Sequence, residues 1–147
     1  MMSQLLRDAS ERPRVFRWNG PVNAERLDEW IHERGWALPK DLVDLWAATG
    51  GGQILDSEVL LPPLPASGVE DDVATSTRHY RSKGMPASYV VFHAGACGLS
   101  AIRLADRQYV QLDAKEFREL GEYDSLEAWY AEVVRAEFWE RYGLARL

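Results

Sequence analysis

The chain has 147 residues, 46% hydrophobic and 27% charged, values typical of one globular domain rather than a disordered segment. Its net charge of −6 argues against direct nucleic-acid binding, and its apolar runs are far shorter than the about 20 residues that cross a bilayer. Cys97 is the single cysteine, which excludes an internal disulfide and fits a reducing compartment. We therefore expect a cytoplasmic protein without membrane contact.

The first half of the chain has the spacing of helices. A short helix is expected over residues 3–11. Asn23 is suited to cap a second helix, which extends to about Arg34. A third helix is expected over residues 39–49, with Pro39 in its first turn. Because few residues join the second and third helices, they are predicted to form a helical hairpin.

In the second half, short segments rich in strand-forming residues alternate with turn residues. Strands are expected over residues 53–55, 58–61, 89–94, 99–104 and 109–113. The third of these is the most apolar and should be central, and the last two should form a β-hairpin. A polar surface helix is expected over residues 68–81, and a long C-terminal helix from Asp124 or Ser125 to Tyr142.

This order of elements predicts the fold class. The strands do not alternate regularly with helices, which disfavours a doubly wound parallel sheet. We expect an α+β fold: an antiparallel meander with helices packed mainly on one face, an N-terminal helical hairpin and a long C-terminal helix. A single domain is expected over residues 1–147.

The third helix carries a recognisable pattern of helix-starting and helix-ending residues. Leu38 and Pro39 stand at its start, and Gly50, Gly51 and Gly52 follow its end. This pattern resembles the signature of the SUKH superfamily, the group that includes the yeast cell-wall-assembly and killer-toxin-resistance regulator.

Later segments are similar to the same family in order and spacing. They are Leu60–Pro62, Tyr89–Gly95, the hairpin 99–113 and Tyr123–Trp129. The resemblance covers residues 23–142 and leaves residues 1–22 as an N-terminal extension.

The resemblance implies a function. Bacterial members of the family typically are immunity proteins, which bind and neutralise toxins of contact-dependent or polymorphic systems. It also implies an α+β fold with no known catalytic constellation. The proline and glycines themselves shape the backbone rather than doing chemistry, and we expect no cofactor. We therefore expect a protein partner, and an acidic surface is compatible with a basic toxin domain.

Enzymatic alternatives find little support in the residues. His93 and Cys97 would stand about 13 Å apart on one extended strand, although the glycines nearby can turn the chain. His32, His79 and His93 lack the spacing of metal ligands. The tight aromatic–basic group at residues 16–18 is more typical of a core and its edge than of a base-stacking site. We expect no catalytic site, no metal site and a non-enzymatic function.

Two binding sites remain as alternatives. A partner-binding surface is expected on the loop and polar helix between the sheet segments, with the acids Asp56, Glu58, Glu70, Asp71 and Asp72. Alternatively, the chain is a regulatory scaffold or a small-ligand-binding domain, with a cleft lined by Trp36, Trp46 and His93. A filled core at these three residues would favour the protein-binding interpretation. The sequence leaves the oligomeric state open.

Overall fold

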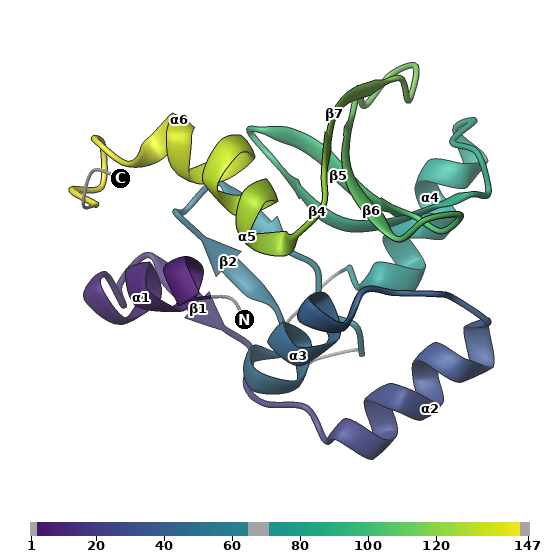
Figure 1. The fold of residues 1–147 in the computed structure, drawn as a ribbon, viewed down its shortest axis with the longest axis horizontal. Helices are drawn as coiled ribbons and strands as arrows, with labels where there is room; N and C mark the ends of the chain where they lie inside the picture. The colour runs from purple at the N-terminus through teal and green to yellow at the C-terminus, as the bar shows by residue number, and fades with distance from the viewer. Residues whose placement is uncertain (1–2, 65–70, 145–147) are drawn as a thin grey trace.

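A computed structural model of the chain describes residues 3–64 and 71–144. Its strands form one antiparallel sheet in which each strand pairs with the next along the chain (Figure 1). The strands are β1 (Phe16–Trp18), β2 (Gly52–Ile54), β3 (Glu58–Leu60), β4 (Tyr89–Gly95), β5 (Gly98–Arg103), β6 (Gln108–Leu112) and β7 (Glu119–Tyr123). The helices are α1 (Ser3–Glu11), α2 (Ala24–Arg34), α3 (Lys40–Thr49), α4 (Val73–Ser82), α5 (Leu126–Trp129), the π-helical turn η1 (Tyr130–Arg135) and α6 (Ala136–Phe138). The α+β class and the antiparallel meander are confirmed.

Most expected elements form close to their expected bounds. Strand β4 has three strands on either side of it, and β5 and β6 pair as a hairpin. Edge strands β1 and β7 were not expected. Both are short, and the Leu120 residue of β7 is 62% exposed. The expected helix 68–81 corresponds to α4, which begins only at Val73, with Asp72 as its N-cap; residues 68–70 lie outside the described residues.

Helices α2 and α3 begin and end where the sequence indicates. The Asn23 side chain accepts a hydrogen bond from the backbone N–H of Arg26, which caps α2. Gly35 and Gly50 follow the two helices in the left-handed conformation, at φ 66° and 71°. The helices meet through Trp30 and Trp46, whose ring centroids lie 6.2 Å apart. Their arrangement as a hairpin stays a prediction.

The glycines after α3 permit a close backbone crossing. An added Cβ at Gly50 would lie 2.2 Å from the carbonyl oxygen of Gly20, and one at Gly52 would lie 2.1 Å from that of Arg17. Gly51 also has a positive φ, of 75°. The crossing therefore attaches the segment before residue 23, which includes β1, directly to the third helix and the sheet. At this position glycine has a structural role.

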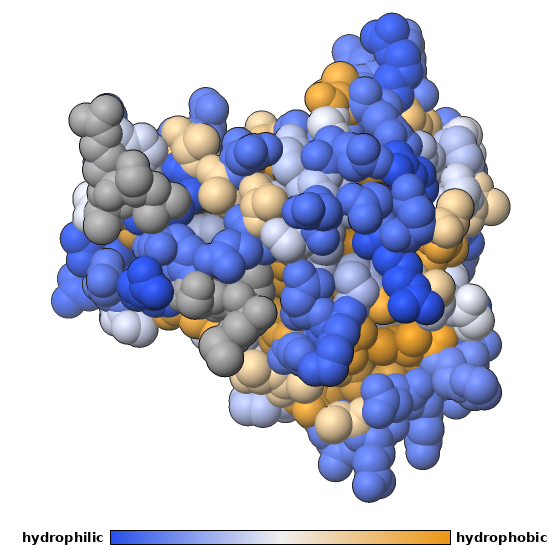
Figure 2. All heavy atoms as spheres, in the orientation of Figure 1, coloured by the Kyte–Doolittle hydropathy of each residue, from blue (hydrophilic) through white to orange (hydrophobic). Residues whose placement is uncertain are grey.

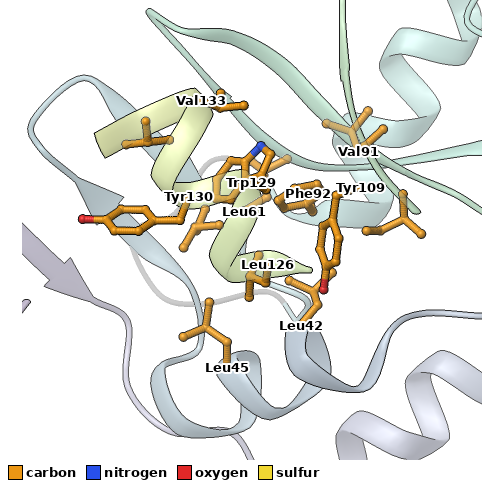
Figure 3. Close-up of a cluster of buried hydrophobic side chains, with 14 of the residues drawn as sticks. Leu42, Leu45, Leu61, Val91, Phe92, Tyr109, Leu126, Trp129, Tyr130 and Val133 are labelled. Atoms are coloured by element: carbon orange, nitrogen blue, oxygen red, sulfur yellow. The ribbon is translucent and has the colours of Figure 1, made fainter. Parts of the chain in front are cut away.

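Helices cover both faces of the sheet. We define the first face by His93 of β4 and the second face by Ala94, its neighbour. The segment α5–η1–α6 and helix α3 pack on the first face, where Trp129 lies beside Phe92 and Leu126 lies near Leu42 (Figure 3). Helix α4 packs against β4 from the second face. On the side of the molecule that Figure 2 shows, the surface is mostly hydrophilic, apart from an apolar area near the connection between α2 and α3.

The expected C-terminal helix to Tyr142 is wrong in its extent and regularity: the helical segment runs from Leu126 to Phe138 and contains a π-helical turn, η1, in its middle. Tyr130 and Arg135 of this turn reach Asp8 of α1, with distances of 2.6 Å from the tyrosine hydroxyl and 2.8 Å from the guanidinium Nε. Gln4 donates a further hydrogen bond to the same carboxylate. All four side chains are buried, so this ion pair holds α1 against the C-terminal segment.

Candidate functional site

A buried polar network connects β3, β4, β5 and α5. One carboxylate oxygen of Glu58 lies 2.9 Å from Nε2 of His93, and Nδ1 of His93 lies 2.9 Å from the hydroxyl of Ser100. The indole N–H of Trp129 donates to the same hydroxyl at 2.9 Å. All four side chains are buried. We call these residues the Glu58 network.

A β-bulge in β4 positions the histidine. The register between β4 and β5 shifts between Val91 and His93, so Phe92 is the extra residue of the bulge. As a result Phe92 lies against Trp129, with ring centroids 4.9 Å apart (Figure 3). The ring of His93 also lies against Trp129, at 5.0 Å. The backbone N–H of Val91 turns toward α4 and donates to the Thr77 hydroxyl.

The hydrogen bonds within the Glu58 network determine which of its atoms carry protons. Because the Trp129 N–H donates to the Ser100 oxygen, the Ser100 hydroxyl is free to donate to Nδ1 of His93. Nε2 of His93 then carries the proton and donates to Glu58. Burial raises the pKa of Glu58, but hydrogen bonds from His93, Ser57 and the backbone of Cys97 outweigh it and lower the pKa from 4.5 to about 2. Glu58 is therefore a carboxylate at neutral pH.

The Glu58 network has the residue types of a hydrolase triad without its accessibility. Ser100, His93 and Glu58 are each 0% exposed, and Trp129 already donates to the serine oxygen. A nucleophilic serine must be open to its substrate. In this conformation the network joins the sheet to α5, and no substrate can reach the hydroxyl.

Cys97 shares Glu58 with the histidine, and no hydrogen bond between Cys97 and His93 is found in the part of the chain that the structure describes. The backbone N–H of Cys97 donates to Glu58 at 3.0 Å. Burial and the nearby Glu58 carboxylate raise the pKa of the Cys97 thiol to about 12. A thiol needs its thiolate form to act as a nucleophile, so this cysteine is unreactive at neutral pH.

An open cleft lies between α4 and the second face of the sheet. Its volume is about 830 Å³. The floor is one row of side chains across four paired strands: Arg17, Gln53, Val59 and Ala94. The wall consists of α4 residues: Thr75, Ser76, His79 and Tyr80.

The polar groups of the cleft are more exposed and make fewer hydrogen bonds than those of the Glu58 network. Ser76 is 7% exposed, and its hydroxyl makes no hydrogen bond within the described ranges and is not among the buried unpartnered atoms, so it reaches the solvent of the cleft. Arg17 forms an ion pair of 3.0 Å with Asp56, and both side chains are exposed. Asp71 lines the cleft and is also exposed. Ser76 and Asp71 therefore remain available to bind a ligand or a partner.

The acids that we expected on one surface have different environments in the structure. The expectation for Glu58 is wrong, because its carboxylate is buried and bonded to His93. Asp72 is the N-cap of α4 and accepts the N–H of Thr75 at 2.7 Å. Glu70 lies outside the described residues. Asp56 and Asp71 are exposed, the first beside Arg17 and the second at the cleft.

The expected ligand cleft at Trp36, Trp46 and His93 does not form, so this expectation is also wrong. Trp46 and His93 are fully buried, and Trp36 is half-buried. Both tryptophans pack on Trp30, whereas His93 packs on Trp129 in another part of the core. The core is filled at these positions.

Sequence reasoning named Asp71 as a partner-binding residue but missed the other residues of the cleft. Arg17 was considered only as part of an aromatic–basic group, and Ser76 and His79 were part of a polar surface helix. The row from Arg17 to Ala94 depends on the pairing of β1, β2, β3 and β4, which no single segment reveals. The available signal was the polar first turn of α4, where Thr75 and Ser76 follow a capping aspartate.

Within residues 3–64 and 71–144, no cluster of three or more histidine, cysteine, aspartate or glutamate side chains could hold a metal ion. In the same ranges no helix is long and apolar enough to cross a membrane. No family model matches the sequence. A comparison with curated proteins also finds no match.

Proposed function

We propose that this chain is a protein-binding module that acts as an immunity protein, neutralising a toxin by binding it. One contrast carries the proposal. The side chains with nucleophile, base and carboxylate chemistry are sealed in the Glu58 network, while uncommitted polar groups line an open surface cleft. Such an arrangement suits recognition at the surface and excludes a substrate from the interior.

The filled core supports binding of a protein over binding of a small ligand in the interior. Trp46 and His93, which would have lined an aromatic ligand pocket, are fully buried and pack on other aromatic rings. The net charge of −6 favours a partner with a basic surface, because opposite charges accelerate association.

The resemblance to the SUKH superfamily supplies the class of partner. Its signature residues occupy structural positions here: Pro39 precedes α3, and Gly50 leaves it in the left-handed conformation. Bacterial members of that family typically neutralise toxins of contact-dependent or polymorphic systems. A basic toxin domain, such as a nuclease, is the partner that this charge and this resemblance together favour.

The test uses a toxin domain encoded beside the gene for this chain. The purified toxin is titrated with the purified chain, and the remaining toxin activity is measured. A binding module inhibits stoichiometrically, with an end point at equimolar protein, and the association rate falls as salt rises. Inhibition far below equimolar chain would indicate catalytic turnover and contradict the proposal.

A single variant tests whether neutralisation of the toxin depends on the Ser100 hydroxyl as a catalytic group. Ser100→Ala removes the serine hydroxyl, and a folded Ser100→Ala protein is expected to neutralise the toxin at the wild-type end point. Circular dichroism confirms the fold before titration. Loss of neutralisation by a folded variant would assign Ser100 a chemical role and remove the binding proposal.

A further inference from the structure

We infer that the cleft between α4 and the second face of the sheet binds an extended, basic segment of a partner protein. The inference rests on the proposed function, because it names the surface and the kind of segment that this surface would hold. The cleft of about 830 Å³ lies within the range of about 300–1,000 Å³ that bound ligands usually occupy.

The first argument is the uncommitted hydroxyl of Ser76. Ser76 lines the cleft, and most of its surface is buried, at 7% exposed. Its hydroxyl forms no hydrogen bond within the described part of the chain and is not among the buried unpartnered atoms, so it reaches the solvent of the cleft. A backbone amide of a bound segment would supply a hydrogen-bond partner for this hydroxyl.

The second argument is a pair of amide acceptors. Asn19 and Gln53 line the cleft, and each donates one side-chain N–H to a backbone oxygen, that of Gly50 and that of Asp56. Their amide oxygens accept no hydrogen bond within the described residues. Such oxygens suit the N–H groups of a peptide backbone and of basic side chains.

The third argument is charge. Asp71 lines the cleft as an exposed carboxylate, and among the described lining residues the guanidinium of Arg17 is paired with Asp56. A basic side chain on the bound segment would pair with Asp71. The net charge of −6 attracts the same kind of partner over longer distances.

The sheet edge beside the cleft suits an extended occupant. Strand β1 is the first strand in the sheet order, so in the described chain no strand pairs with its outer side. Arg17 of β1 and the following Asn19 both line the cleft. Extended peptides commonly bind where an exposed strand edge adjoins side-chain pockets. Of the possible occupants, an extended segment therefore fits best.

The experiment uses a display library of short random peptides, selected on the immobilised full chain. We expect the selected peptides to be enriched in lysine and arginine. Thr75→Trp fills the cleft from an exposed position, and Asp71→Lys inverts its charge. Isothermal titration with the selected peptides should show each variant to bind at least about tenfold more weakly than the wild type.

Two matched controls lie away from the cleft. Arg78→Trp places the same indole on another exposed position of α4, and Asp28→Lys inverts an exposed acid of α2. Both should bind the peptides within about twofold of the wild type. In NMR spectra the peptides should shift the amide signals of Gln53, Ser76 and Ala94.

Four results would overturn the inference: no enrichment of peptides, enrichment without basic residues, equal binding by Thr75→Trp and Asp71→Lys, or amide shifts confined to another surface. If Thr75→Trp does not fold, Asp71→Lys and the NMR shifts decide.

Titration of the toxin separates this inference from the proposed function. Undiminished neutralisation by both cleft variants would overturn the cleft and leave the function standing. Peptide binding in the cleft without any toxin neutralisation would overturn the proposed function and leave the cleft inference standing.

Discussion

The two faces of strands β3 and β4 differ in their exposure: one is buried and the other is open. On the first face, Glu58 and His93 form hydrogen bonds and are buried beneath α5. On the second face, their neighbours Val59 and Ala94 form the floor of an open cleft. Because side chains alternate along a strand, one step in the sequence separates a sealed network from an accessible surface.

The difference lies in which hydrogen bonds are already made. The Glu58 carboxylate accepts from His93, Ser57, Ala96 and Cys97, so it has no capacity left for a ligand. In the cleft, the Ser76 hydroxyl and the acceptor oxygens beside it have no such partners in the described chain. Satisfied polar groups stabilise the fold, whereas unsatisfied ones at a surface are available for binding.

The largest expected effect comes from breaking the network at its carboxylate. Glu58→Ala leaves the His93 ring and two backbone N–H groups without their acceptor. We expect the free energy of unfolding to fall by about 3–5 kcal/mol. Urea denaturation followed by tryptophan fluorescence measures it. A loss below about 1 kcal/mol would show that the network contributes little.

Acid should weaken the same network. The folded-state pKa of Glu58 is lowered to about 2, so its stabilisation is complete above the unfolded value of 4.5 and is lost as pH falls toward 2. The full contribution is on the order of 3 kcal/mol. Urea denaturation at a series of pH values between these limits measures it. Glu58→Gln should flatten this part of the pH profile, and an unchanged slope would contradict the assignment.

A matched pair of serines compares the two faces directly. Ser100→Ala leaves the Trp129 N–H and one nitrogen of His93 without a partner. We expect the free energy of unfolding to fall by about 1–3 kcal/mol. Thermal and urea unfolding of the purified variant measure it, and an effect equal to that of the cleft serine would contradict the comparison.

The smallest expected effect is that of the cleft serine. Ser76→Ala removes a hydroxyl that makes no hydrogen bond within the described residues, so the free energy of unfolding should change by less than about 0.5 kcal/mol. The same variant should bind the selected basic peptides about threefold more weakly. A large loss of stability would mean that this hydroxyl has a structural partner.

Sequence reasoning succeeded where short-range chemistry decides. Asn23 caps α2, and Gly35 and Gly50 leave their helices in the left-handed conformation, because caps depend on neighbours a few residues away. The apolar run in β4 correctly predicted the central strand. Strand β1 was missed because three residues carry too little pattern, and its place comes from pairing with β2.

The buried acid shows why the candidate site was harder to predict. An acid beside a turn is usually solvated, and on that basis Glu58 was placed on the surface. Its burial depends on His93, on the backbone N–H groups of Ala96 and Cys97, and on the bulge that turns His93 toward the same face. These partners come from β4 and the turn after it, more than thirty residues away.

The sequence by itself determined α2 and α3 with the glycines that end them, the central apolar strand, the β-hairpin and the antiparallel α+β class, because hydrophobic spacing and glycine conformation act locally. Only the tertiary structure decided which polar side chains are sealed and which line a surface. That outcome depends on strand register, on one bulge and on which helix covers each face. Contacts between distant segments set all three, so they bring together residues that show no common pattern along the chain.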